Sequence, residues 1–229
     1  NAWEKEGIDM RLLKRESGRM PGLYTIQVDE SGERTFHYWR DRSAAKAYFS
    51  SPSTPLEEQI DDINVLYFSG ISLAILDAAG RDRLFKAAER LRAHGGKVIY
   101  DNNYRPRLWP VTVEARAWYA LAYEISDIVM VTLDDEMALF GITDEQKALE
   151  RVLAMPCQEV VIKRGSEPAI VRELGKEPLY VPACKVDKVV DTTAAGDSFA
   201  AGYLAARLTG KSAEESVRSG ARMASVVIQ

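Results

Sequence analysis

From residue 65 onward the chain alternates short apolar runs with stretches of helical periodicity, and this rhythm constrains the fold more than any other feature. Runs of four or five mostly apolar residues begin at Val65, Lys97, Ile128 and Val160, with apolar residues at helical spacing between them. Strands that are apolar along their whole length are buried on both faces, which is typical of a parallel sheet covered by helices on both sides. The sequence therefore predicts an α/β fold, doubly wound around a mostly parallel sheet.

Two local patterns refine the carboxyl-terminal part of this fold. Thr143 is a candidate N-cap for a single helix that leads to the strand at 160. Two later strands, at 169–173 and 179–182, are expected to pair antiparallel. Ser212 and Glu215 then have the spacing of a capping box, which predicts the start of the last helix.

A β-hairpin is predicted before this region, within residues 22–42. Two segments rich in β-branched and aromatic residues flank turn-forming residues at 29–32. Alternation places Tyr24 on one face of the first strand, and Tyr38 together with Arg40 on one face of the second. This face either packs on a core or, because it carries an arginine beside aromatic residues, faces a ligand.

Composition excludes several classes of function. The chain has 229 residues, 46% of them hydrophobic, and a net charge of −4, whereas proteins that bind nucleic acid usually carry a basic excess. No apolar run approaches the roughly 18 residues that cross a bilayer, so we expect no membrane partner. Cys157 and Cys184 are too few for a disulfide framework and are interpreted as reduced thiols of a cytoplasmic protein.

The two ends of the sequence suggest part of a longer polypeptide. The chain opens on Asn1-Ala2-Trp3 without an initiator Met, and a helical pattern runs into Gln229 without a cap. The length allows one large α/β domain or two small ones. We expect residues 1–229 to form one domain that is incomplete at both termini.

The segment 191–199 carries the most chemical information. Ala194, Ala195 and Gly196 stand where a loop becomes a helix, and such small side chains leave backbone N–H groups unshielded at the positive end of the helix dipole. This predicts an anion site. Asp197, an acid within that site, suits a general base directed at a substrate hydroxyl. The alternative is an ordinary helix start, where acids are favoured.

A second informative segment, 101–109, follows the strand that begins at Lys97. Open α/β sheets bind their ligands at the carboxyl ends of such strands. Arg105 can hold a carboxylate through two parallel hydrogen bonds, and Asn103 offers a donor and an acceptor to hydroxyl groups. The alternative is a polar loop anchored by the packed ring of Trp109.

The run Asp-Thr-Thr-Ala-Ala-Gly-Asp-Ser-Phe at 191–199 is similar to the second signature of the ribokinase (PfkB) family of sugar kinases, and the resemblance extends over essentially the whole chain. It implies a ribokinase-like fold in which the hairpin at 22–42 is a lid. It also implies that Ala195 and Gly196 form the anion hole for the transferring phosphoryl group. Asp197 would take the proton from the sugar hydroxyl.

The run Asp-Asn-Asn-Tyr-Arg-Pro-Arg-Leu-Trp at 101–109 resembles the loop of those family members that act on 2-keto-3-deoxygluconate (2-dehydro-3-deoxy-D-gluconate). In them an Asn-x-Arg arginine faces the sugar-acid carboxylate and the bound phosphates, and lid residues of the type Tyr and Tyr-x-Arg contact the keto acid. The resemblance implies ATP-dependent phosphorylation of the terminal hydroxyl to the 6-phosphate. A kinase for a neutral sugar such as fructose, and a non-catalytic fragment of a sugar kinase, are the alternatives. The implied substrate-binding residues are Tyr24, Tyr38, Arg40, Asn103, Arg105 and Asp197.

The nucleotide side of the resemblance is partial. Leu133-Asp134-Asp135-Glu136 stands in place of the family's Asn-x-x-Glu, so only Glu136 is carried over, as a residue that organises Mg²⁺ through water. Asp134 and Asp135 are interpreted as solvated acids at a helix start. Lids of this family often pair, so we expect a homo-oligomer formed through the hairpin. The implied nucleotide-binding residues are Lys163, Gly165, Ala194, Ala195 and Gly196.

Overall fold

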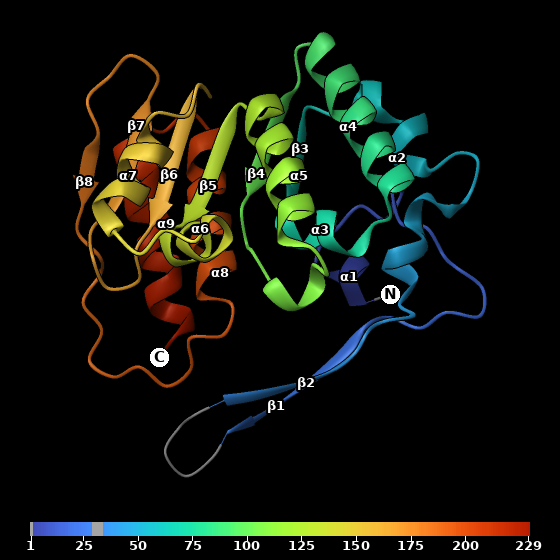
Figure 1. Ribbon diagram of the computed structural model, residues 1–229, viewed down its shortest axis with the longest axis horizontal. Helices are drawn as coiled ribbons and strands as arrows, with labels where there is room; N and C mark the ends of the chain where they lie inside the picture. Colours follow the sequence, from blue (N-terminus) through green and yellow to red (C-terminus); the bar gives the residue numbers. More distant parts are fainter. Residues whose placement is uncertain (1, 29–33) are drawn as a thin grey trace. The chain divides into compact units, whose positions relative to one another are not determined.

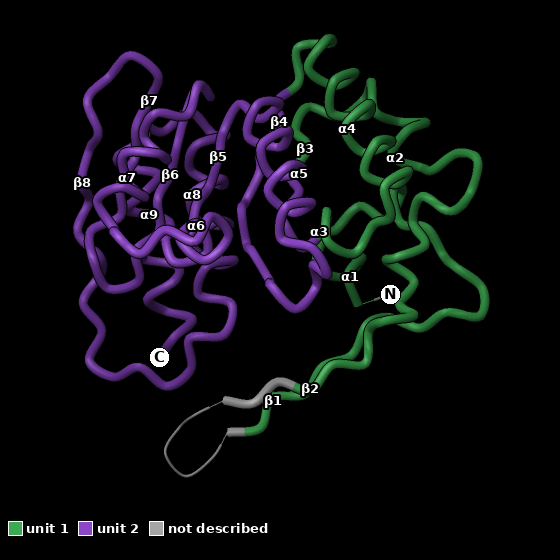
Figure 2. Tube along the Cα trace, in the orientation of Figure 1, with its two compact units in different colours: residues 1–66, 72–96 green, residues 67–71, 97–229 purple. Residues whose placement is uncertain are grey.

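The computed structural model describes residues 2–28 and 34–229, so the turn predicted at 29–32 lies outside the described residues. Contacts along the chain divide it into two compact units, which Figure 2 distinguishes by colour. Each unit is described by itself. Unit 1 comprises residues 1–66 and 72–96, and unit 2 comprises residues 67–71 and 97–229.

Unit 1 is built around the helix α4 (Ala78–Ala93). The side chain of Asp77 caps this helix by accepting a hydrogen bond from the Gly80 N–H at 2.7 Å, and Leu84 and Leu91 are buried on its inner face. The remaining elements of the unit are short: α1 (Ala2–Lys5), η1 (Ala44–Ser50), α2 (Pro55–Glu58) and η2 (Ile60–Asp62).

The predicted hairpin is present in unit 1 as β1 (Leu23–Val28) and β2 (Arg34–Trp39), which pair antiparallel. The register sets Tyr24 directly opposite Tyr38. Both rings are exposed, 49% and 40% respectively. Within unit 1 this face is therefore not the face of a core, and the ligand-facing alternative is the one that the exposure favours.

Unit 2 contains a mixed sheet whose strand order is β3-β4-β5-β6-β7-β8. The strands β4, β5 and β6 pair parallel, and β6, β7 and β8 pair antiparallel, which confirms the α/β prediction and the two antiparallel strands after Gly165. The strands are β3 (Val65–Ser69), whose first two residues are counted in unit 1, β4 (Lys97–Asp101), β5 (Ile128–Thr132), β6 (Glu159–Lys163), β7 (Ala169–Glu173) and β8 (Leu179–Val181).

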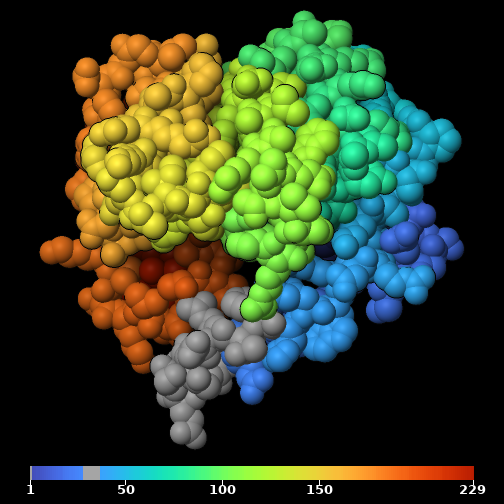
Figure 3. All heavy atoms as spheres, in the orientation of Figure 1, coloured from blue at the N-terminus to red at the C-terminus, as the bar shows by residue number. Residues whose placement is uncertain are grey.

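Helices cover both faces of this sheet, as expected for a doubly wound fold (Figure 1). The helices α6 and α7 lie on one face, and α8 and α9 lie on the other. In the space-filling view, the light-green and yellow atoms of α5 to α7 form the near surface over the middle of this unit (Figure 3). The helices that lie wholly within unit 2 are α5 (Thr112–Ile125), α6 (Leu133–Phe140), α7 (Glu145–Leu153), α8 (Ala195–Leu208) and α9 (Ala213–Val227), whereas α3 (Gly70–Ile75) begins in unit 2 and ends in unit 1.

Of the two helix caps predicted from the sequence, one is confirmed and one is wrong. The capping box of Ser212 and Glu215 is confirmed at the start of α9. Thr143 is not a cap: the side chain of Asp144 accepts hydrogen bonds from the first turn of α7. Moreover, the segment expected to form one helix forms two, because Gly141, with φ of 69°, ends α6 in the left-handed conformation. Among the described residues, no helix has the length and apolarity needed to span a membrane.

Candidate active site

The start of α8 has no side-chain cap, unlike the starts of α4, α7 and α9 and like that of α5, whose N-cap is Val111. Asp77, Asp144 and Ser212 each cap their helices with a side-chain oxygen, whereas the N-cap of α8 is Ala194, which has none. Ala194 has φ of 62°, an uncommon conformation for a residue with a Cβ. N–H groups in the first turn of a helix lack partners within the helix. The Ala195 N–H donates to the Thr192 carbonyl at 3.2 Å, so the start of α8 presents the N–H groups of Gly196 and Asp197 at the positive end of the dipole, rather than those of the predicted pair Ala195 and Gly196.

Asp197 is exposed in this first turn. Its carboxylate lies close enough to Tyr67 of β3 for its negative charge to disfavour ionisation of the phenol. Burial raises the pKa of Tyr67, and the carboxylates of Asp101 and then Asp197 raise it further. The phenol of Tyr67 therefore stays protonated and can serve as a hydrogen-bond donor.

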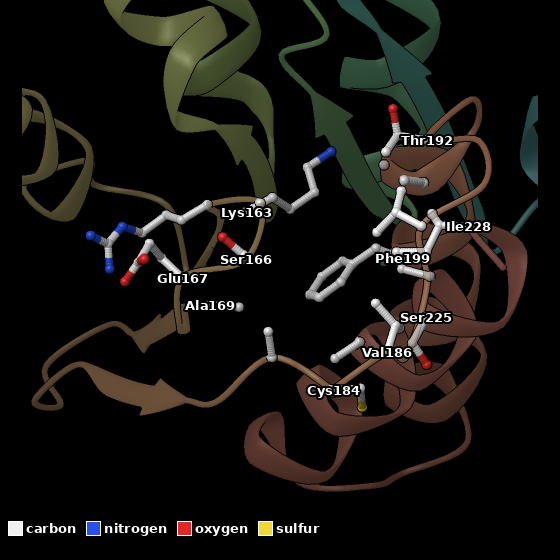
Figure 4. A pocket seen from close by; sticks show the side chains of 18 of the residues that line it. Lys163, Ser166, Glu167, Ala169, Cys184, Val186, Thr192, Phe199, Ser225 and Ile228 are labelled. Carbon is white, nitrogen blue, oxygen red and sulfur yellow. The ribbon is translucent and has the colours of Figure 1, made fainter. Parts of the chain in front are cut away.

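A cavity of about 400 Å³ adjoins the start of α8 (Figure 4). Four of the predicted nucleotide-binding residues line it, Lys163, Gly165, Ala195 and Gly196, whereas Ala194 does not. The rest of the wall is largely apolar, and Figure 4 shows the ring of Phe199 directed into the cavity. Such a wall beside an anion site suits a flat heteroaromatic ring that carries phosphates. The apolar lining residues include Ala183, Val186, Val189, Phe199, Ala221 and Ile228.

A buried ion pair joins the ends of β4 and β6. The Lys163 ammonium donates to both carboxylate oxygens of Asp101, at 3.0 and 2.7 Å. The Asp101 side chain is fully buried, and the Lys163 side chain is 10% exposed. The Tyr67 hydroxyl is 3.4 Å from the same carboxylate. The sequence placed Lys163 near the nucleotide but assigned no role to Asp101 or Tyr67.

The loop after β4 is fixed by Asn102, whose side-chain amide forms hydrogen bonds with both the N–H and the carbonyl of Thr132. Its Oδ1 accepts from the Thr132 N–H at 2.9 Å, and its Nδ2 donates to the Thr132 carbonyl at 3.1 Å. Asn103, which follows, has φ of 27°, and its buried Oδ1 has no hydrogen-bond partner among the described residues. Strain and an unsatisfied polar atom together mark a functional residue more often than a structural one. This favours the predicted role of Asn103 in substrate binding.

Arg105, in the same loop, is held by Asp135 of α6. The Asp135 carboxylate accepts from Arg105 Nη1 at 3.3 Å and from the Tyr104 N–H at 3.1 Å. The Arg105 side chain nevertheless remains 45% exposed, so its guanidinium can still meet a ligand. Asp135 is therefore not the solvated acid that the sequence suggested, although its neighbour Asp134 is exposed. Burial raises the pKa of Asp135, and Arg105 opposes that rise.

Glu136 lies in a buried cluster rather than at the surface of the cavity. Its side chain is fully buried, one oxygen accepts from the Tyr123 hydroxyl at 2.5 Å, and the other accepts from Arg151 Nε at 3.1 Å. Burial raises the pKa of Glu136, and Tyr123 and Arg151 oppose that rise. Among the described residues, no three His, Cys, Asp or Glu side chains form a group that could hold a metal ion. The role of Glu136 in magnesium binding stays a prediction.

The predicted lid residues gather on one face of the hairpin in unit 1. The rings of Tyr24 and Tyr38 are 6.2 Å apart, and the Arg40 guanidinium lies 4.2 Å from the centre of the Tyr38 ring. Gly22 permits this arrangement, since a Cβ there would come within 2.9 Å of the Arg40 Cβ. The result is a cationic and aromatic surface. These lid residues belong to unit 1, and the other predicted site residues belong to unit 2.

Comparison with known proteins agrees with the family resemblance. The family model described as pfkB family carbohydrate kinase matches residues 1–229. The 2-dehydro-3-deoxygluconokinase of Escherichia coli K12 is 47% identical over 232 residues, covering all of this chain and 75% of the relative. The chain thus spans about three quarters of that relative's length.

Solved structures share the fold at lower identity. A PfkB protein from Polaromonas sp. JS666 superposes with a TM-score of 0.83 at 24% identity, covering 100% of this chain and 74% of that one. A putative ribokinase II from E. coli, solved in complex with ATP and Mg²⁺, gives a TM-score of 0.71 at 24% identity, covering 86% of this chain and 62% of that one. With the match over the whole chain, the chain belongs to the pfkB family of carbohydrate kinases.

Proposed function

We propose that this protein transfers the γ-phosphoryl group of ATP to the terminal hydroxyl of 2-dehydro-3-deoxy-D-gluconate. The observation that carries this proposal is the uncapped start of α8, where Asp197 is exposed beside two backbone N–H groups and the cavity lined by Lys163 and Gly196. An anion site with a carboxylate in it suits transfer of a phosphoryl group to an alcohol. ATP is the phosphoryl donor expected of this family.

The chemistry needs few groups from the protein. The Asp197 carboxylate accepts the proton of the attacking hydroxyl, whose oxygen forms a bond to the γ-phosphorus. The bond from that phosphorus to the bridging oxygen of ATP breaks, and ADP leaves with the electron pair. The N–H groups of Gly196 and Asp197 stabilise the negative charge on the transferring group, because they are fixed before the reaction begins.

The substrate assignment rests on Arg105. A guanidinium suits a sugar acid better than a neutral sugar, since it matches a carboxylate with two parallel donors. Asp135 orients this guanidinium while leaving it half exposed, and the strained Asn103 lies two residues away. The relative with 47% identity is named for phosphorylation of the same keto acid. The lid face of the hairpin keeps the role that the sequence predicted for it, which is contact with the keto acid through Tyr24, Tyr38 and Arg40.

Magnesium is expected with ATP, as in the related ribokinase II complex. The described residues do not offer a direct site, because both oxygens of Glu136 are already bonded within the fold. Mg²⁺ commonly keeps several waters and binds through substrate phosphates, so this lack is compatible with a requirement for the ion. We therefore assign no side chain as a direct magnesium ligand.

Assembly and location are further proposals. The exposed aromatic hairpin supports pairing with a second copy of the chain, and light scattering coupled to gel filtration would measure the oligomeric state. A cytoplasmic location agrees with two free cysteines, Cys157 and Cys184. Cell fractionation would test it.

A substrate panel tests the proposed function. The purified protein is supplied with ATP, magnesium and either 2-dehydro-3-deoxy-D-gluconate, gluconate or fructose, and ADP release is measured with identification of the product by NMR. We expect turnover of the keto acid to its 6-phosphate, and Arg105→Lys should raise KM for it by about tenfold or more. Equal turnover of fructose, slowed equally by Arg105→Lys, would instead indicate a general sugar kinase. No turnover of any sugar would indicate a non-catalytic chain.

A further inference from the structure

The ion pair of Asp101 and Lys163 is unusual because it is buried and yet borders a cavity. Asp101 is the last residue of β4, Lys163 is the last residue of β6, and β5 lies between the two strands. Taking two charges out of water is costly, and apolar side chains of similar size often stabilise a fold equally well. A pair of this kind therefore has no necessary structural purpose at this place.

The geometry shows what the ammonium can reach. A Cβ built on Gly196 would lie 3.8 Å from Lys163 Nζ, so the ammonium stands in contact with the first turn of α8. Lys163 and Gly196 both line the cavity, and Figure 4 shows the Lys163 side chain at its wall. An ammonium carries three N–H donors, and the two bonds to Asp101 account for two of them. The third is available to a ligand at the anion site.

The surroundings of the ammonium are mainly acidic. Asp101 pairs with it directly, the Tyr67 phenol reaches the same carboxylate, and Asp135 and Asp197 lie within electrostatic range of this group of residues. Pairing with an anion offsets part of the cost of burying an ammonium. Asp101 therefore fixes the position of the Lys163 ammonium beside Gly196.

We propose that Lys163 is a further catalytic residue that contacts the transferring phosphoryl group, and that Asp101 is the positioning residue that holds its ammonium at Gly196. This inference rests on the proposed function and deepens it. A fixed cation at the place where negative charge develops lowers the barrier to transfer without reorganising at the moment of reaction. The competing explanation is that the pair merely ties β4 to β6.

Four variants separate these explanations: Lys163→Met, Asp101→Asn, the double variant that carries both changes, and the control Lys176→Met. Breaking one half of a buried pair leaves an unpaired charge and can unfold the protein, whereas the double variant removes both charges. The double variant is therefore the decisive one. Lys176 forms an exposed ion pair with Glu173, its side chain being 66% exposed, and serves as the matched lysine away from the cavity.

The measurements are kcat and KM for each substrate, the thermal midpoint, and the dissociation constants of ADP and of the non-transferable β,γ-imido analogue of ATP. We expect the folded double variant to lose about 10²-fold in kcat, with KM for the sugar acid little changed. Its affinity for the imido analogue should fall about tenfold, and that for ADP much less, because the lost contact is to the terminal phosphate. Lys176→Met should leave all of these values unchanged.

The two single variants and the double variant form a double-mutant cycle, which also tests the role of Asp101. If Asp101 acts through Lys163, Asp101→Asn should lower kcat when Lys163 is present and should have no further effect in the Lys163→Met background. If instead each substitution lowered kcat independently, so that the two factors multiplied in the double variant, the positioning role would be overturned. A folded double variant with kcat near the unaltered value, or with equal losses of affinity for ADP and the imido analogue, would overturn the catalytic role. If the unaltered protein phosphorylates no sugar, the proposed function fails, and the two dissociation constants still decide whether Lys163 contacts the terminal phosphate.

Discussion

The Asp135 carboxylate accepts hydrogen bonds from the Arg105 guanidinium and from the backbone N–H of Tyr104, and it thereby fixes an arginine that is still half exposed. The two residues are 30 positions apart and come from the loop after β4 and the first turn of α6. An arginine held in this way has already lost much of its side-chain freedom, so binding a carboxylate costs less conformational entropy. The substrate assignment therefore depends on Asp135 as well as on Arg105.

Asp135→Asn should raise KM for the keto acid by on the order of fivefold, since a partly exposed ion pair is worth about 1 kcal/mol. The thermal midpoint should change little. Steady-state kinetics with Asp134→Asn as the control checks this, because Asp134 is the exposed neighbour in the same helical turn. An equal rise of KM in both variants would contradict a specific role for Asp135.

Gly22→Ala should disturb the lid surface without removing any of its side chains. The new Cβ would lie within 2.9 Å of the Arg40 Cβ, so the Arg40 backbone or side chain must move away from the Tyr38 ring. We expect KM for the keto acid to rise and that for ATP to stay constant, and Arg40→Lys should have the same effect. Arg42→Lys, at an exposed arginine just beyond the strand, is the matched control. An unchanged KM in both Gly22→Ala and Arg40→Lys would exclude the lid face from substrate binding.

The two cysteines should differ in their reaction with N-ethylmaleimide. Cys184 is exposed and lines the cavity, whereas Cys157 is buried and burial raises the pKa of its thiol. Because the thiolate is the reactive form, Cys184 should be modified first. Saturating ADP should slow that reaction if the cavity binds the nucleotide. Mass spectrometry of labelled peptides measures both rates, and modification of Cys184 at the same rate with and without ADP would count against the cavity as the nucleotide site.

Glu136→Gln should act mainly on stability. The carboxylate accepts from Tyr123 and Arg151 in a buried setting, and hydrogen bonds to charged groups contribute about 1.5–3 kcal/mol each. We expect a lower free energy of unfolding in denaturant titration, and unchanged stability would contradict the structural role of the two bonds. The magnesium concentration for half-maximal activity, measured with the same variant, tests the water-mediated role that the sequence predicts.

Local patterns in the sequence were sufficient for the fold of unit 2, and insufficient for parts of the site. Strands such as β5, buried on both faces, and the capping box at Ser212 are encoded within a few residues. Local sequence does not decide whether Thr143 or Asp144 caps α7, since either side chain has a suitable oxygen. The ion pair of Asp101 and Lys163 joins residues 62 positions apart, and no periodicity or motif links them.

The residues of the candidate site also fall into those that a local pattern predicts and those whose partners are distant in the sequence. The sequence predicts Asp197 and Gly196 as site residues because an anion site at a helix start is a local feature, and Asn103 and Arg105 because they follow a strand. Asp135 was interpreted as solvated because its partner, Arg105, comes from a different loop. Tyr67 was missed for the same reason, since the acids beside it lie on β4 and α8. Contacts between segments far apart in the sequence had to come from the structure.

The most direct test of the account is the kcat of Asp197→Asn with 2-dehydro-3-deoxy-D-gluconate and ATP. The substitution keeps the size of the side chain and removes the base, so kcat should fall by on the order of 10²-fold or more. The dissociation constant of ADP should remain close to that of the unaltered protein, because backbone N–H groups and the cavity wall are unchanged. A variant that binds ADP normally and turns over the keto acid at a nearly unaltered kcat would contradict the assignment of Asp197 as the base.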